Sequence, residues 1–199
     1  MAVTHVLYEA DGWGVGELVV DDDRVVWHEL PQPRAHDPRP QGTGLGGTRP
    51  AGTGTRKDPS RTPTHPGHGA GIPRKAWRGG RGFPAEVIRL LQAYFAGASA
   101  ALEQVPVDLE YDTDFRGRCA DALRAVPRGE VVTYGELAAL AGAPGAARAA
   151  GSFCARNRLG LFVPCHRVVA AGGLGSYGSL GLAYKRRLLA LEGWSGDAL

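Results

Sequence analysis

The sequence has few cysteines and lacks any long apolar run. Only three cysteines occur among the 199 residues, and the spacing of Cys119, Cys154 and Cys165 fits no zinc-ligand pattern. No stretch of 18 or more apolar residues is present, which argues against a membrane span. The first residues lack a basic segment followed by an apolar one, so we expect no secretory signal, reduced thiols and a cytoplasmic location. At least one thiol is then free for chemistry, or all three are small core residues.

Acidic residues are scarce in two parts of the chain. Residues 34–81 carry ten Lys and Arg against two Asp and Glu, and residues 116–199 carry eleven against five. The remaining residues carry two basic side chains against thirteen acidic ones. A basic C-terminal part attracts polyanions, so this distribution indicates nucleic acid as a partner there. Ordinary scatter of surface charge is the alternative explanation.

Large apolar residues are almost missing from the segment at about 34–82, which is rich in Gly, Pro, Thr and Arg. Such a segment cannot bury enough area to offset its chain entropy. We expect a disordered basic insertion, which acts as a linker or touches a phosphate backbone.

Regular structure is predicted on both sides of this insertion. Within residues 16–30, two stretches rich in apolar residues flank a turn of three aspartates, which predicts a β-hairpin. Residues 83–97 predict a helix with Pro84 in its first turn, Gly97 at its end and one buried face. That face carries Val87, Leu90, Leu91, Tyr94 and Phe95. Residues 105–111 predict a short strand or a connector.

The C-terminal part predicts three helices, over residues 114–126, 133–142 and 146–157. Thr133 and Glu136 form a capping box at the start of the second helix. A short Gly-containing break joins the second and third helices, as in a helix-turn-helix. The third helix has very small side chains, so its backbone can closely approach either a neighbouring helix or a nucleic-acid groove. In the groove, Arg148 would be its long projecting group.

The stretch "PCHRVV" places Cys165 beside His166. A thiol attacks as the thiolate, so at neutral pH it needs a nearby base or positive charge that favours loss of its proton. Neighbours in an extended chain point to opposite sides, so direct contact between these two needs a turn, and a water relay is the alternative. Glu192 is a candidate to orient the imidazole. A buried cysteine next to an exposed histidine is the plainer interpretation of the pair.

A glycine-rich stretch follows at residues 172–181. It matches G-x-G-x-x-G at Gly173, Gly175 and Gly178, but a dinucleotide fold needs a further βαβ unit that the remaining residues cannot supply. We interpret the stretch as a loop beside Cys165.

Four stretches in this order resemble the O6-alkylguanine-DNA alkyltransferase (methylated-DNA–protein-cysteine methyltransferase) family: "GEVVTYGELAALAGAPGAARAAG", "ARN", "PCHRVV" and "YKRRLLALEG". The resemblance covers about residues 113–193. It implies an α/β N-terminal ribonuclease-H-like domain over residues 1–107. It also implies a mainly α C-terminal domain with a winged-helix-like helix-turn-helix over residues 108–199.

The implied activity is irreversible, single-turnover repair of DNA. An alkyl group moves from O6-alkylguanine, and less readily from O4-alkylthymine, to a cysteine of the protein after base flipping. The implied partner is double-stranded DNA carrying the lesion, and no cofactor, metal or membrane is expected for a protein acting as a monomer.

The resemblance assigns a role to each matching residue. Cys165 would accept the alkyl group, His166 would take its proton through a water, and Glu192 would orient His166. Asn157 would act as the hinge, and Tyr134 would act at N3 of the flipped guanine. Arg148 would fill the gap in the base stack. The other residues implied in DNA binding are Thr133, Ala147, Ala149, Gly151 and Arg156, and the substrate pocket would include Val168, Tyr177, Gly178 and Ser179.

The chain departs from the family pattern at several positions. Arg158 follows the hinge residue where a proline is common, and Cys154 stands where a larger apolar residue is common. Two other classes of protein are the alternatives. Alkyltransferase-like proteins bind lesions without transfer, but they replace the reactive cysteine. A cysteine hydrolase or a cofactor-binding enzyme unrelated to DNA would need neither the helix-turn-helix nor the positive charge of the C-terminal half.

Overall fold

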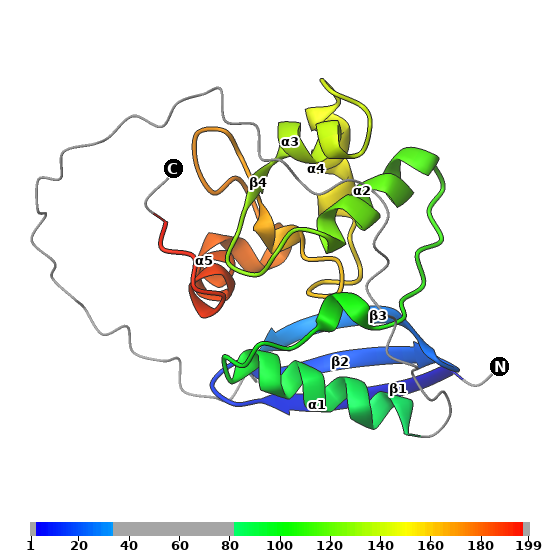
Figure 1. Cartoon of the computed structure of the whole chain (residues 1–199). Helices are drawn as coiled ribbons and strands as arrows, with labels where there is room; N and C mark the ends of the chain where they lie inside the picture. The colour runs from blue at the N-terminus through cyan, green and yellow to red at the C-terminus, as the bar shows by residue number, and fades with distance from the viewer. Residues whose placement is uncertain (1–2, 34–81, 197–199) are drawn as a thin grey trace, which may run out of the picture.

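The computed structural model describes residues 3–33 and 82–196, which form a mixed α/β protein (Figure 1). Three antiparallel strands, in the order β1-β2-β3, make the N-terminal sheet. They are β1 (Val3–Ala10), β2 (Gly14–Asp21) and β3 (Arg24–Gln32). The predicted hairpin is confirmed as β2 and β3, with Asp22 in a left-handed conformation at the turn. The strand β1 was not predicted.

Helix α1 (Phe83–Phe95) lies along this sheet (Figure 1). The prediction for residues 83–97 is confirmed, including a proline in the first turn and the left-handed Gly97 just beyond the helix. The spacing of apolar residues explains the packing, because one helix face enters the core. The buried residues of that face are Phe83, Val87, Leu91, Tyr94 and Phe95.

The C-terminal part contains the three helices predicted, each shorter than the apolar pattern suggested. They are α2 (Asp114–Arg124), α3 (Tyr134–Leu140) and α4 (Ala147–Ala155), and α3 packs against α4 as expected for a helix-turn-helix. Thr133 and Glu136 form the predicted capping box. Elements that were not predicted are η1 (Leu102–Gln104), β4 (Val132–Thr133), η2 (Cys165–Arg167), β5 (Val168–Val169), η3 (Gly178–Leu180) and α5 (Gly181–Leu191).

The edge of β3 that does not pair with β2 joins the sheet to the C-terminal part. Val25 bridges to Val107, so the segment predicted as a strand or connector is a connector with a single bridge. Further along β3, the backbone N–H of His28 donates to the carbonyl of Arg158 at 2.9 Å. Because both segments hydrogen-bond to one strand, the sheet supports the chain that leads to Cys165 directly.

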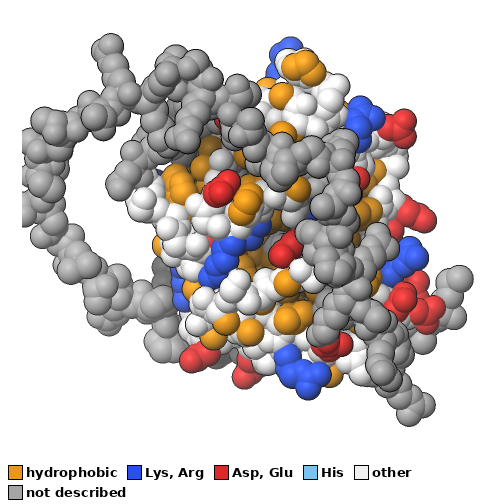
Figure 2. Space-filling view, in the orientation of Figure 1, with side chains coloured by type: hydrophobic (Ala, Val, Ile, Leu, Met, Phe, Trp, Pro, Cys, Tyr) orange, Lys and Arg blue, Asp and Glu red, His pale blue; other side chains and the backbone are white. Residues whose placement is uncertain are grey.

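The predicted insertion at about 34–82 lies almost wholly outside the described residues, and it stays a prediction. Among the helices described, none is long and apolar enough to cross a membrane. Basic and acidic side chains are interspersed on the face that Figure 2 shows, with hydrophobic side chains between them.

Candidate active site

The cysteine-bearing segment runs from the end of α4 to β5. Leu161, Phe162, Val163 and Pro164 are buried, which anchors the chain immediately before Cys165. Leu161 has a φ of 72°, a left-handed conformation that is costly for a side chain of this kind and clusters at functional sites. Cys165 then begins the 3-10 turn η2. The local structure therefore presents this thiol at a fixed position.

Asn157 closes the loop that leads to Cys165. Its Nδ2 donates to the carbonyl of Val163 at 2.7 Å, and its Oδ1 accepts from the backbone N–H of Leu159 at 3.0 Å. Burial raises the pKa of the Cys165 thiol, while a hydrogen bond from Asn157 and the nearby Lys185 ammonium act against this rise. Asn157 thus holds the loop and favours the thiolate form at the same time.

The turn at Cys165 directs His166 into the interior. His166 is fully buried, and its Nε2 lies 3.0 Å from Oε1 of Glu192. Because a carboxylate accepts, Nε2 carries the proton and Nδ1 keeps a lone pair. Burial lowers the pKa of His166, so the ring is neutral near pH 7. Nδ1 is buried and has no hydrogen-bond partner among the described residues. A buried unpaired acceptor is costly and is suited to take up a proton.

Glu192 is held by three side chains. Nε of Arg167 donates to its Oε2 at 2.8 Å and Nη2 to its Oε1 at 2.7 Å, and the hydroxyl of Tyr94 donates to Oε1 at 2.8 Å. Burial alone would raise the pKa of Glu192, but the hydrogen bonds from His166 and Arg167 hold it well below its usual range. The carboxylate is therefore ionised and fixes the tautomer of His166.

Lys185 is a fully buried cation behind the glycine-rich loop. Its Nζ donates to the carbonyls of Val168 at 2.5 Å and Leu174 at 2.6 Å. Burial lowers the pKa of Lys185, and the thiols of Cys165 and Cys154 raise it. This ammonium therefore ties the loop to the strand after Cys165 and adds positive potential near the thiol.

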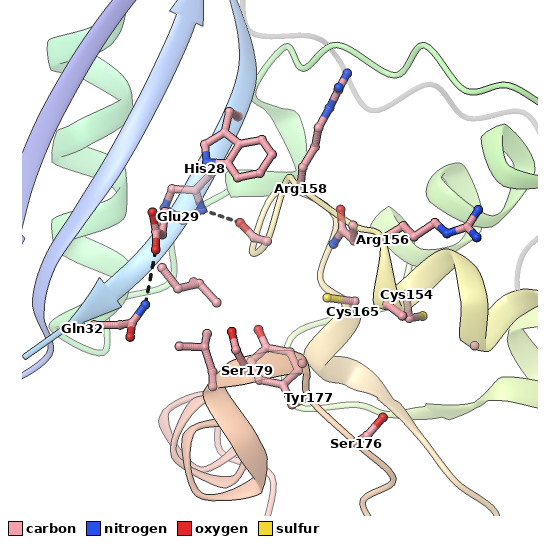
Figure 3. Close-up of a pocket in the computed structure, with 18 of the residues that line it drawn as sticks. His28, Glu29, Gln32, Cys154, Arg156, Arg158, Cys165, Ser176, Tyr177 and Ser179 are labelled. Atoms are coloured by element: carbon pink, nitrogen blue, oxygen red, sulfur yellow. Dashed lines mark hydrogen bonds between the residues drawn. The ribbon is translucent and has the colours of Figure 1, made fainter.

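A cavity of about 660 Å³ lies over Cys165. The predicted site residues that line it are Tyr134, Gly151, Arg156, Asn157, Cys165, Tyr177, Gly178 and Ser179. Figure 3 shows Tyr177 and Ser179 across the opening from strand β3. Tyr134 is hydrogen-bonded to Ser176, and burial raises its pKa, which keeps the phenol protonated.

Other predicted site residues do not line this cavity. His166 and Glu192 are buried and are not part of its lining, and Val168 is buried in β5, where it pairs with Val132. Thr133 uses its hydroxyl to cap α3, accepting from the N–H of Glu136 at 3.1 Å.

The remaining residues predicted to bind DNA lie on the outer face of α4. Arg148, Ala149 and Ser152 are exposed, while Ala150 and Phe153 anchor the opposite face in the core. The exposed face is therefore a smooth surface with one long cation. It leaves the backbone accessible to a partner that approaches closely.

Sequence reasoning gave no role in the site to Tyr94, Arg167, Lys185 or His28. The burial of Lys185 could have been predicted from the sequence. It is spaced three, four and seven residues from Leu188, Leu189 and Glu192, so all four lie on one side of a helix. This is the buried side of α5, and Glu192 lies just beyond its end. Among the described residues, no group of three His, Cys, Asp or Glu side chains is placed to hold a metal ion.

The fold and the site define a protein with a helix-turn-helix beside a half-buried cysteine and a buried pair of histidine and glutamate. The sequence model of the 6-O-methylguanine DNA methyltransferase, DNA binding domain, matches residues 114–194. A methylated-DNA–protein-cysteine methyltransferase of Mycobacterium leprae is 45% identical over 121 residues, which are 60% of this chain and 71% of that protein. One from Methanosarcina acetivorans is 43% identical over 120 residues, or 59% of this chain and 74% of that protein.

Solved structures agree with this similarity. The crystal structure of Mycobacterium tuberculosis O6-methylguanine methyltransferase has a TM-score of 0.61 and 29% identity, covering 96% of this chain and 93% of that one. The Mycobacterium tuberculosis OGT structure in complex with DNA has a TM-score of 0.59 and 30% identity, covering 92% and 89%. The chain belongs to the methylated-DNA–protein-cysteine methyltransferase family.

Proposed function

We propose that this chain repairs DNA by transferring an alkyl group from O6-alkylguanine to Cys165. Homologues named for this activity and a related structure with DNA support alkyl transfer with DNA as the partner. The observation that carries the choice of residue is the position of Cys165. Cys154 and Cys165 both line the cavity, but only Cys165 directly precedes His166, whose buried ring is paired with Glu192. O4-alkylthymine is a poorer substrate in this proposal.

The buried groups supply the proton transfer. Cys165 loses its proton, through a water molecule, to the free Nδ1 of His166, and Glu192 stabilises the imidazolium that forms. The thiolate attacks the alkyl carbon, so a carbon–sulfur bond forms as the carbon–O6 bond breaks. Guanine leaves with the electron pair of that bond, and the Tyr134 phenol supplies a proton at N3. The thioether is stable, so each molecule reacts once.

The DNA is held by the outer face of α4. O6 of a stacked guanine cannot reach a thiol inside a cavity, so the nucleotide must be flipped out, at a cost of a few kcal/mol. Arg148 fills the gap in the stack, while Ala147, Ala149 and Gly151 allow the backbone to enter the minor groove. Arg156 and the helix start at Thr133 contact the strand nearby. The exposure of Arg148 and Ala149 supports this assignment.

The domain organisation is part of the same proposal. Residues 1–107 form a ribonuclease-H-like domain, supported by the antiparallel sheet that precedes α1. Residues 108–199 form the DNA-binding alkyltransferase domain. The protein acts as a monomer in the cytoplasm, and its three free cysteines agree with a reducing compartment.

The test is the mass of the intact protein after incubation with a duplex oligonucleotide containing O6-methylguanine. We expect a gain of one methyl group, located on the Cys165 peptide. Cys165→Ala abolishes the gain and still binds DNA, while Cys119→Ala and Cys154→Ala serve as matched controls and react. A wild-type protein that binds the lesion without gaining mass is a lesion-binding protein without transfer, and that result overturns the proposal.

A further inference from the structure

Arg128 lies in the turn that follows α2 and joins the ends of two other helices. Its Nη1 donates to the carbonyl of Ala98 at 2.8 Å and its Nη2 to that of Gly97 at 3.2 Å, just after α1. Nη2 also donates to the carbonyl of Leu191, the last residue of α5, at 2.6 Å. Figure 1 shows the ends of α1 and α5 on the same side of the molecule. One guanidinium thus holds the peptide that joins Leu191 to Glu192 against the end of α1.

The same guanidinium lies over the ring of Tyr94, with Cζ of Arg128 5.2 Å from the ring centroid. At this distance a cation is attracted to the face of an aromatic ring. Tyr94 is buried in the last turn of α1, and its hydroxyl donates to Oε1 of Glu192 at 2.8 Å. Burial and the carboxylate of Glu192 raise the pKa of Tyr94, so the hydroxyl stays protonated and donates. Arg128 therefore fixes both the backbone before Glu192 and one of the donors to its carboxylate.

The carboxylate that these contacts hold is the partner of His166. Oε1 of Glu192 accepts from Nε2 of His166 at 3.0 Å as well as from Tyr94. The turn around Arg128 also lies tightly against Glu192, since a Cβ at Gly129, whose φ is 82°, would lie 3.0 Å from the Glu192 carbonyl oxygen. A hydrogen bond weakens as it departs from linearity, so Oε1 stabilises the imidazolium fully only while it stays in line with Nε2. A small displacement of Glu192 therefore weakens His166 as a base.

We propose that Arg128 and Tyr94 are positioning residues for alkyl transfer. They keep Glu192 in line with His166, so that the histidine can take the proton of the thiol. The inference rests on the proposed function and extends its proton relay to α1, in the N-terminal part of the chain. Neither positioning residue lines the cavity over Cys165, so both act through Glu192. Without them Glu192 keeps its other hydrogen bonds, but less of the Cys165 thiol is ionised near neutral pH.

The test measures the rate of transfer from an O6-methylguanine duplex under single-turnover conditions, from about pH 7 to about pH 9. We expect Tyr94→Phe, which keeps the ring and loses only the hydroxyl, to react about tenfold more slowly than the wild type near pH 7. The deficit shrinks as the pH rises, because hydroxide then ionises the thiol without His166. Arg128→Met shows the same pattern, and Arg128→Lys, which keeps a cation, recovers part of the rate. Affinity for unmodified duplex stays at the wild-type value in each variant.

Arg187→Met is the matched control. The guanidinium of Arg187 also lies over an aromatic ring, 3.7 Å from the centroid of Trp13, and donates to the carbonyl of Gly12 at 2.7 Å. These contacts join α5 to the turn between β1 and β2 instead of to Glu192, so we expect the wild-type rate at every pH. The other titratable or charged groups that face Cys165 and His166 are the same in all variants: Tyr134, Cys154, Arg167, Tyr177 and Lys185.

Two results overturn the inference. One is a wild-type rate near pH 7 for Tyr94→Phe or for Arg128→Met. The other is a deficit that stays constant as the pH rises, which is the pattern of residues that only support the fold. A wild type that gains no methyl group at any pH overturns the proposed function and this inference together.

Discussion

His28 of the N-terminal sheet donates a hydrogen bond from Nδ1 to the carbonyl of Gly160, 2.7 Å away, in the segment that leads to Cys165. The carbonyl only accepts, so Nδ1 carries the proton and Nε2 accepts from the hydroxyl of Tyr8 at 2.7 Å. The ring is buried and lies edge-on to Phe162. One neutral imidazole thus links two strands of the sheet to the loop before the thiol.

Removing this imidazole tests the link. We expect His28→Ala to lower the free energy of unfolding by about 2–4 kcal/mol, because it leaves a cavity and two buried polar groups without a partner. Alkyl transfer slows as well, since the loop before Cys165 loses its support. Urea unfolding followed by circular dichroism measures the first effect. His5→Ala is the control, because its ring is exposed and bonds Glu17 at the surface, so a similar loss in both variants would contradict the link.

The same ring makes stability depend on pH. Burial lowers the pKa of His28 from 6.5 to about 4, so between these values the unfolded chain binds a proton that the folded chain does not. The contribution of neutral His28 to the free energy of unfolding is therefore fully present above pH 6.5. It falls by roughly 3 kcal/mol in total as the pH drops towards 4. Urea unfolding across this range measures the slope. We expect His28→Gln to have a shallower slope, and the remainder comes from groups such as His166, whose pKa burial also lowers. An unchanged slope would show that His28 does not titrate as argued.

Lys185 tests how the thiolate is stabilised. We expect Lys185→Met to move the pH profile of alkyl transfer to higher pH and to lower the rate near pH 7, because the buried ammonium acts against the rise in the pKa of Cys165. The rate of transfer from an O6-methylguanine duplex is measured across the neutral and mildly alkaline range. Arg186→Met, at an exposed position on the same helix, is the matched control. A variant that is slower at all pH values with an unshifted profile would leave Lys185 with a role in holding the loop only.

The site residues that could be predicted from the sequence lie close together in short motifs. Cys165 and His166 are adjacent, and Glu192 was a candidate partner of His166 that the resemblance then supported. Tyr94 was predicted only as a buried helix residue, because its bond to Glu192 joins positions 98 residues apart. His28 and Gly160 are 132 residues apart, and no local pattern relates them.

Other elements were missed for physical reasons. Strand β1 has exposed Val3 and Leu7, so its alternation of apolar and polar residues is weak. The pairing of β4 with β5 involves two residues on each strand and leaves no periodic signal. That pairing is also why Val168, expected in the substrate pocket, is buried against Val132.

Arg158 replaces a residue that is commonly proline in the family, and its role differs from that of Arg156. Nη2 of Arg158 lies 3.3 Å from Oδ2 of Asp108, so it links the segment after α4 to the connector at residues 105–111. We expect Arg158→Ala to lower the free energy of unfolding by less than about 1 kcal/mol, because the pair is partly exposed. The salt dependence of DNA binding stays unchanged. Arg156→Ala reduces the slope of log affinity against log salt by about one, as loss of a phosphate contact does. Fluorescence anisotropy at several salt concentrations measures both slopes, and the reverse pattern would assign the phosphate contact to Arg158.

Arg148 has the clearest test of base flipping. Its side chain projects from the exposed face of α4 and is not part of the cavity lining, so it cannot act on the reacting atoms directly. We expect Arg148→Ala to slow transfer from duplex DNA by about tenfold or more, because extrusion of the base costs a few kcal/mol that the inserted side chain offsets. Reaction with free O6-benzylguanine base needs no extrusion and stays near the wild-type rate. The two rates are measured under single-turnover conditions, with Arg89→Ala on α1 as the exposed control. Equal losses on duplex and free base would rule out the proposed role of Arg148 in the base stack.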